Sequence, residues 1–463
     1  MVDADWKRLH PGSIAVNLIP RTWLALRGLW PLLLAAVLGR RTTPNHLMDA
    51  VIIGMLLVST VGNTVFHWAT LRYRVHDGRL EIQSGLISRQ MRSIDVSRVQ
   101  NVEIVRNVFQ RMAGLAEVRV ETASGREVEG QLSALSTAEA QALVESLGGS
   151  RAAVAGVDTS ETVVQNDLTD LLKYGATGTR FAQAAIGLSL ALEAVQWVTA
   201  DVRIVPPRAF IALLPLAGLG AWLAGTVGAV VAYQGYVLLR RSDGRLAVDG
   251  GLFTRRRVEW RTNKVQAVMI DEPWLRRLAG LASVRVETAA VTRGEGGTAT
   301  AEALVPAVAS ERIAFVVNAV SALSADPETT VWKPAHPLAI LRAIVFAAIR
   351  GLVLTSLATW FLWPWGALVG LVIPLFLALA WADSRALAWA LTDEALLVRG
   401  GYFRRETSII PRAKVQSATI LQPLWWRRRR VARLAVSAAG VQIAVPPMDE
   451  DDANALLTAL VPR

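Results

Sequence analysis

Two short segments of this sequence combine aromatic and basic side chains, and their chemistry suits a lipid surface. An indole ring settles in the headgroup layer of a bilayer, while a guanidinium binds lipid phosphate. Each basic residue near an anionic surface contributes on the order of 1 kcal/mol. We therefore predict that nine residues contact anionic lipid or a partner: Trp274, Arg276, Arg277, Trp425, Trp426, Arg427, Arg428, Arg429 and Arg430.

An alternative interpretation treats both segments as loops between strands. Their aromatic residues would then belong to a core, and their arginines would be solvated. The segment 109–111, with Phe109 and Arg111, is a weaker version of the same pattern. Both interpretations stay open at the level of the sequence.

The residue types that most enzymes use are missing or scattered. The chain has no cysteine, and its five histidines are not paired at the spacing of metal ligands. It contains neither G-x-S-x-G nor H-E-x-x-H, and the Gly-rich stretch 294–297 lacks the Lys-Ser/Thr ending of a phosphate-binding loop. We expect a protein that is not an enzyme and that has no metal site and no cofactor.

Composition indicates a membrane protein. Hydrophobic residues make up 52% of the 463 residues, the mean hydropathy is +0.36 and the net charge is +11. A large positive charge suits an anionic partner, either nucleic acid or a lipid surface. In a chain with bilayer spans it more often reflects basic cytoplasmic loops. We expect as partners the anionic lipids of the inner face and other membrane or cytoplasmic proteins, and no nucleic acid.

Six apolar runs come in pairs: 22–38 with 47–68, 181–200 with 210–232, and 338–361 with 364–382. About 20 helical residues cross the ~30 Å of hydrocarbon in a bilayer. Three transmembrane hairpins would place both termini and the polar regions on one side. Basic residues flank the spans mainly on that side, with Arg40 and Arg41 as a discordant pair. The positive-inside rule therefore predicts a multi-pass protein of the cytoplasmic (inner) membrane with both termini in the cytoplasm.

A stretch of 47 residues occurs three times without a gap, at 77–123, 243–289 and 393–439. The first two copies share 22 of 47 positions, including Gly-Leu, Val-Gln, Ala-Gly-Leu-Ala and a closing Val-Arg-Val-Glu-Thr-Ala. Alternating apolar residues, Gly turns and a Ser-x-x-Glu capping box at 136–139 predict short antiparallel strands followed by one helix. The expected fold is a small open barrel closed by that helix.

These motifs resemble the bacterial PH-domain membrane proteins of the YdbT-like type, the second type of bacterial PH domain. The resemblance covers three tandem units and nearly the whole chain. It implies an α+β membrane protein in which six transmembrane helices form three hairpins, each followed by a PH-like split β-barrel with a C-terminal helix. The third copy departs most, with Arg429-Arg430-Val431 in place of Ala-Gly-Leu and Ser437-Ala438 in place of Glu-Thr.

The predicted domain organisation follows from the repeats and the apolar runs. An N-terminal interfacial segment, three transmembrane hairpins and three PH-like domains alternate, with two linkers. Their bounds are 1–21 for the N-terminal segment; 22–68, 181–232 and 338–382 for the hairpins; 69–148, 233–323 and 383–463 for the PH-like domains; and 149–180 and 324–337 for the linkers.

Two ionisable residues lie near the middle of predicted spans. An intramembrane charge is costly and needs a partner. Glu193 and Arg350 are opposite in sign and at similar depth, so we predict an ion pair between them that joins two units. A transport pathway is the alternative reading of such a site.

These features together predict a non-enzymatic integral membrane protein that presents three cytoplasmic PH-like domains as binding or scaffold modules in an envelope-related role. The alternative is a lipid or peptide transporter, or an export accessory, that uses the six-helix bundle.

Overall fold

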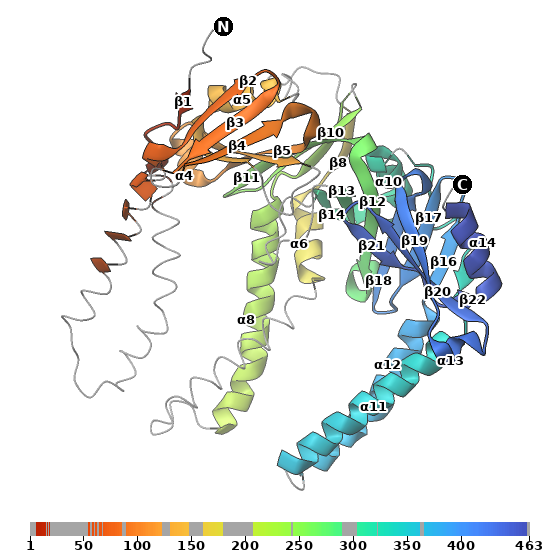
Figure 1. Ribbon diagram of the computed structural model, residues 1–463. Helices are drawn as coiled ribbons and strands as arrows, with labels where there is room; N and C mark the ends of the chain where they lie inside the picture. The colour runs from red at the N-terminus through yellow and green to blue at the C-terminus, as the bar shows by residue number, and fades with distance from the viewer. Residues whose placement is uncertain are drawn as a thin grey trace. The chain divides into compact units, whose positions relative to one another are not determined.

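The computed structural model is shown in Figure 1. It describes 71–85, 89–122, 130–147, 161–178, 207–241, 244–288, 303–321, 323–361 and 365–460, with parts of 6–18 and 54–70. The chain forms two compact units, one of residues 1–161 with 179–260 and the other of 162–178 with 261–463. The second copy of the repeat is divided between them.

In the first unit, copy one and the segments that flank it fold into two antiparallel sheets, a short helix and a closing helix. Its first sheet has the order β1-β2-β3-β4, and its second half contributes the strand order β7-β6-β5. Val118, Val120 and Leu132 are fully buried between strands and helix. The elements are β1 (Lys7–Arg8), β2 (Arg72–His76), β3 (Arg79–Ser84), β4 (Gln90–Asp95), β5 (Val99–Arg106), α4 (Val108–Met112), β6 (Leu115–Thr122), β7 (Gly130–Ser136) and α5 (Thr137–Ser146).

The second sheet of copy one continues into copy two. Strand β5 pairs antiparallel with β11, so that Glu103 faces Val258 and Val102 faces Glu259. The order then runs from β11 to β10 and β9. The first half of copy two thereby extends the last half of copy one. Its strands are β9 (Val237–Arg240), β10 (Arg245–Gly250) and β11 (Arg255–Arg261).

The second unit contains the same junction between copies two and three. Strand β12 pairs antiparallel with β18, and the sheet has the order β14-β13-β12-β18-β17-β16-β15. Helix α10 covers the strands from copy two. The elements are β12 (Val265–Pro273), α9 (Trp274–Leu278), β13 (Leu281–Thr288), β14 (Ala303–Ala309), α10 (Ile313–Ser321), β15 (Lys333–Pro334), β16 (Ala388–Leu391), β17 (Ala395–Gly400) and β18 (Arg404–Pro411).

The last half of copy three closes the second unit. Strands β19, β20 and β21 pair in that order, and β22 adds to β20. Leu396 and Ile410 from the first half of copy three pack with Leu434 and Val436 and with Leu456 of the final helix in one core. The elements are β19 (Val415–Leu421), α13 (Leu424–Arg427), β20 (Val431–Ala438), β21 (Val441–Ala444), β22 (Met448–Asp449) and α14 (Glu450–Leu460).

The repeated Val-Gln step is a β-bulge in all three copies. The register of β5 on β6 shifts between Val99 and Asn101, that of β12 on β13 between Val265 and Ala267, and that of β19 on β20 between Val415 and Ser417. A short 3-10 turn precedes each bulge, at Val96–Arg98, Thr262–Lys264 and Arg412–Lys414. A bulge bends its strand, so this step marks where each copy turns from its first sheet into its second.

Local signals in the sequence identified several elements well. The capping box at Ser136 and Glu139 is present and opens α5. The two predicted linkers, however, contain regular structure. The first includes β8 (Glu161–Gln165) and α6 (Leu168–Ala176), and the second includes β15. Asn166 donates a side-chain hydrogen bond of 2.6 Å to the Ala307 carbonyl, so 161–178 packs against β14.

Candidate membrane-spanning helices are found among the described residues, fewer than the six predicted. Two helices are long and apolar enough to cross a membrane, Leu338–Trp360 and Gly366–Arg385. They belong to the predicted third hairpin, seen as α11 (Leu338–Phe361), a 3-10 stretch (Trp365–Val372) and α12 (Ile373–Arg385). In Figure 1, α11 and α12 run side by side, which their contacts confirm. Helix α8 (Pro207–Tyr233) includes the shorter apolar stretch Gly218–Tyr233.

The expectation of six spans therefore rests partly on sequence alone. Runs 22–38 and 181–200 lie outside the described residues, and 47–68 is described only in part. The last predicted span also differs from a simple α-helix, because it begins with the 3-10 stretch. Gly366 in that stretch lies so close to α11 that an added Cβ would overlap the Ala358 carbonyl.

The junction between copies one and two encloses a carboxyl group. Glu103 is 1% exposed and lies 3.7 Å from the Arg119 guanidinium and 3.9 Å from that of Arg256. Burial raises the pKa of Glu103, and the two arginines offset part of that rise. A carboxyl with a raised folded pKa contributes stability that is complete below its unfolded pKa and is lost as the pH rises through its folded pKa.

We expect Glu103→Gln, which cannot ionise, to raise the thermal unfolding temperature of the detergent-solubilised chain more at about pH 8 than at about pH 5. Thermal denaturation at both pH values measures this. Glu311→Gln, at an exposed turn, serves as the control. An equal effect of Glu103→Gln at both pH values would contradict a raised pKa of Glu103.

Candidate membrane-facing surface

The exposed side chains around α13 form an apolar and basic patch. Leu424 is 79% and Trp425 is 54% exposed, and Arg427, Arg428 and Arg429 are exposed beside them. Among the described residues, no ion pair involves these three arginines. Burial lowers the pKa of Arg433 in β20, and repulsion from Arg342 lowers it further. We call Leu424, Trp425 and Arg427–Arg430 the α13 patch.

The α13 patch is fixed to the beginning of α11. Trp426 is 1% exposed and packs with Leu338, the first residue of α11, and with Val431. The Arg342 guanidinium lies 5.9 Å from the centre of the Trp426 ring. The predicted contact of Trp426 with lipid or a partner is therefore wrong, because its ring fills the core that joins helix to sheet. Trp425, its neighbour, points outward.

Arg430 has a backbone conformation that normally needs glycine. Its φ is +51°, and the equivalent residues Gly114 and Gly280 both have φ of +66°. A left-handed non-glycine residue costs roughly 1–2 kcal/mol. Its guanidinium lies 3.2 Å from Asp451 and 3.9 Å from Glu450 at the start of α14. Exposed ion pairs contribute little, so the strain at Arg430 is not fully offset by these contacts.

A second group of apolar side chains lies at the end of α12. Asp383 accepts a hydrogen bond of 2.8 Å from the Tyr402 backbone N–H, and the Trp274 N–H donates one of 2.6 Å to the Phe403 carbonyl. The aromatic residues are exposed by 43% for Trp274, 50% for Tyr402 and 42% for Phe403, and Leu278 is 77% exposed. Both ends of the α11–α12 hairpin that adjoin the sheets therefore carry exposed apolar side chains.

The two predicted arginines of this region have different surroundings. Arg277 is partly exposed and donates to the Tyr402 carbonyl at 3.3 Å. Arg276 is 5% exposed, donates to the Ser283 hydroxyl at 2.7 Å and stacks 4.3 Å from the centre of the Tyr174 ring. The predicted surface contact of Arg276 is wrong, because its donors are used to hold α6 against copy two.

Sequence reasoning did not single out Leu424, Tyr402 and Phe403. A usable signal was present, since Tyr402 and Phe403 directly follow Gly401, whose φ is +81°. Copy two repeats this arrangement with Leu252 and Phe253, 44% and 57% exposed, after Gly251. An apolar pair at the tip of a glycine turn is unexpected in water.

In the first unit the equivalent tip adjoins the end of α8. The Leu252 N–H donates to the Val231 carbonyl at 2.9 Å, and Arg111 of α4 donates to the Leu252 carbonyl at 2.7 Å. Phe109 and Met112 of α4 are 43% and 83% exposed. The short helix and the glycine tip thus meet at the end of a long apolar helix in both units.

The predicted ion pair of Glu193 and Arg350 stays a prediction, because Glu193 lies outside the described residues. Arg350 is exposed on α11, and its Nε donates to the Phe346 carbonyl at 3.3 Å. It lines a cavity of about 340 Å³ together with Asp383 and Phe403 and with apolar residues of α11 and α12.

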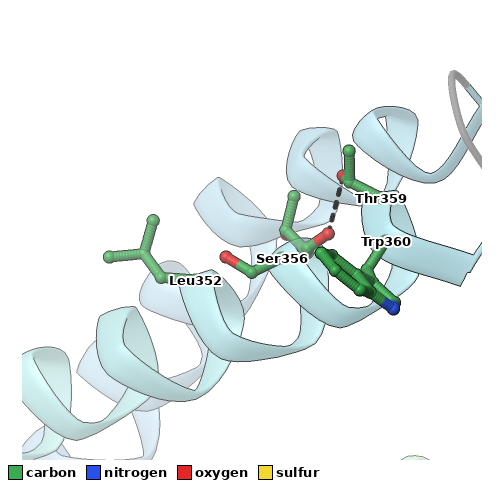
Figure 2. A pocket seen from close by; sticks show the side chains of 5 residues that line it. Leu352, Ser356, Thr359 and Trp360 are labelled. Carbon is green, nitrogen blue, oxygen red and sulfur yellow. Dashed lines mark hydrogen bonds between the residues drawn. The ribbon is translucent and has the colours of Figure 1, made fainter.

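A second cavity, of about 490 Å³, borders one side of α11 (Figure 2). Leu352, Ser356, Thr359 and Trp360 line it along successive turns, together with Thr355. The hydroxyls of Thr355 and Thr359 donate to the carbonyls of Gly351 and Thr355 in the same helix, both at 2.8 Å. These two hydroxyls are therefore satisfied without a ligand.

The described residues contain no group of three or more His, Asp or Glu side chains that could hold a metal ion. Together, the antiparallel sheets, the closing helices and the two helices that are long and apolar enough to cross a membrane define an α+β protein with candidate membrane spans. A family model described as Bacterial PH domain matches residues 25–151, 170–324 and 339–462, and the chain belongs to this family. The resemblance inferred from the repeats is thereby confirmed.

The chain is also similar to the UPF0699 transmembrane protein YdbT of Bacillus subtilis (strain 168). The two are 21% identical over 97% of this chain and 97% of that protein. No solved structure matches the chain.

Neighbouring tryptophans on α13 provide a first test of the patch. We expect Trp426→Ala to lower the free energy of unfolding by about 3–5 kcal/mol, because it empties a core site. Trp425→Ala should change it by less than about 0.5 kcal/mol. Chemical denaturation of the two variants measures both values, and similar losses would show that Trp425 is also a core residue.

The strain at Arg430 provides a second test. We expect Arg430→Gly to raise the free energy of unfolding by up to about 1 kcal/mol, because glycine adopts a positive φ without cost. Arg429→Gly, at a position without a positive φ, should lower it by about 0.5–1 kcal/mol. A loss of stability in both variants would refute the strain.

Proposed function

We propose that the chain is a non-enzymatic, multi-pass protein of the inner membrane whose three hairpins hold three PH-like domains at the cytoplasmic face, where they serve as binding or scaffold modules in an envelope-related role. The third domain docks on anionic lipid through Trp425 and Arg427–Arg430. The observation that carries this proposal is the exposed, positively charged α13 patch beside the first residue of α11.

The position of the α13 patch supports a contact with headgroups. Trp426 ties α13 to Leu338, where α11 leaves the sheets. A helix that spans the bilayer begins in the headgroup layer, and aromatic side chains are enriched there. The exposed ring of Trp425 and the side chain of Leu424 therefore lie at the depth of the headgroup layer, where apolar side chains contact lipid instead of water.

Charge supports an anionic leaflet as the partner. Arg427, Arg428 and Arg429 together would contribute about 3 kcal/mol to docking, or roughly a hundredfold in the docked population. The strain at Arg430 points the same way, since copies one and two have glycine there. The strained backbone at this position favours a role for Arg430 other than stability.

Docking on anionic lipid should shield the side chain at position 424 from water. We expect a spin label on Leu424→Cys, in an otherwise cysteine-free chain, to be shielded from a water-soluble relaxation agent in phosphatidylglycerol nanodiscs. Arg427→Ser, Arg428→Ser and Arg429→Ser combined should expose it, as should high salt, which screens charge. Power-saturation spectroscopy measures this accessibility.

A matched control removes three other exposed arginines. Arg89→Ser, Arg98→Ser and Arg261→Ser combined lower the net charge equally, but these exposed residues belong to copies one and two, so the label should stay shielded. Equal shielding in phosphatidylcholine and phosphatidylglycerol nanodiscs would reject an anionic lipid as the partner.

Transport of lipids or peptides is the second candidate function, and the cavity beside Ser356 favours it. A pathway needs polar groups that face the cargo. Thr355 and Thr359 donate instead to their own helix, as hydroxyls packed within a membrane do. We therefore place docking and scaffolding before transport.

A further inference from the structure

Two junctions join successive copies of the repeat, and both have the same register. Val102 of β5 faces Glu259 of β11, and Val268 of β12 faces Ile409 of β18. Counted from the first residue of each copy, residue 26 of one copy faces residue 17 of the next in both junctions. The junction is thus a reproducible antiparallel contact between the last half of one copy and the first half of the following copy.

The two strands that would continue this series lie at sheet edges. Strand β4 is the last in the order β1-β2-β3-β4, and β19 is the first in β19-β20-β21. They correspond by repeat position to β11 and β5. Within the part of the chain that the structure describes, neither has a partner strand along its outer edge.

Exposure shows what the missing neighbour would cover. In β12, which has a neighbour, every residue is buried or half-buried, whereas in β19 Gln416, Ser417, Thr419 and Leu421 are exposed. In β4 the four residues from Gln90 to Ser93 are exposed, Met91 by 57%.

The edge of β19 has little protection against pairing. Natural edge strands carry charges, prolines or bulges that prevent association. The seven residues of β19, Val-Gln-Ser-Ala-Thr-Ile-Leu, include no charge and no proline, and the bulge lies at their start. Such an edge is a template for another strand.

We propose that β19 of one molecule pairs antiparallel with β4 of a second copy of this chain, in the register of the two internal junctions. Ala418, residue 26 of copy three, then faces Ser93, residue 17 of copy one, and Ile420 faces Met91. The contact joins different surfaces of the two molecules, so it is head-to-tail and builds rings or rows rather than a symmetric dimer.

The choice of a second copy as the occupant follows from the repeat. Strands β5 and β12 pair with β11 and β18, which occupy the same repeat position as β4. Every molecule has a β4 whose outer edge lacks a partner strand among the described residues. A strand from another protein would pair with the edge of β19 but would leave the edge of β4 without a partner. The proposal is independent of the lipid contact of α13.

Disulfide trapping in membranes tests the register directly. The chain has no cysteine, so two differently tagged full-length chains, one with Ser93→Cys and one with Ala418→Cys, carry a single thiol each, and only a disulfide between the two variants joins both tags. Facing residues of an antiparallel pair are about 4.5–5.5 Å apart at Cα, within the range of a disulfide. We expect oxidation to give a species of twice the chain mass that carries both tags.

A one-residue slip is the matched control. Ser417→Cys in place of Ala418→Cys points to the opposite face of the strand, so the yield with Ser93→Cys should fall several-fold. Met91→Cys with Ile420→Cys is a second pair in the same register, which covers a folding defect in the first. Unchanged thermal unfolding temperatures of the single-cysteine chains verify their fold.

Three results would overturn the proposal. The facing pairs could give no more double-tagged product than the slipped pair. Two chains with Ala418→Cys could cross-link to each other more than to Ser93→Cys, which would mean that β19 pairs with itself. The untreated chain in nanodiscs could have the mass of a single copy by native mass spectrometry.

Discussion

Edge-to-edge pairing of strands between successive copies is the constraint from which the rest of the structure follows. A small open barrel leaves strand edges with unpaired N–H and C=O groups. Here the edge of β5 is paired with β11 of the next copy, and the edge of β12 is paired with β18. Successive copies therefore share sheets instead of forming independent domains joined by flexible linkers. The segments between the copies contain regular secondary structure. Segment 161–178 and strand β15 show this, since both pack or pair with the sheets they were expected only to connect.

The bulge at the Val-Gln step makes this arrangement possible. It bends the chain between the first and second sheets of each copy, so that the two halves of a copy belong to different sheets. The cost of the junction is visible at Glu103, a carboxyl desolvated between strands of two copies. Two arginines near it reduce this cost without removing it.

Exposed apolar residues concentrate where the sheets meet the long helices. Glycine tips with Leu252-Phe253 or Tyr402-Phe403 and the short helices α4 and α9 repeat this pattern in the two units. After the third short helix, α13, Arg430 occupies the position that is glycine in the other two copies, and its backbone is strained. The third copy therefore combines the same apolar contact with a concentration of positive charge that the others lack.

The sequence by itself determined the three copies, their strands and closing helix, the family and the apolar runs, because these depend on periodicity and on local turn and cap chemistry. It also located the segments at Trp274 and Trp425. Only the tertiary structure decided that Arg276 and Trp426 are buried while Trp425 is exposed, since neighbouring residues on a one-turn helix face opposite sides. It also decided which copy supplies the partner of each edge strand. Pairing between copies leaves no local mark in the sequence, because each strand fits any partner with the same alternation.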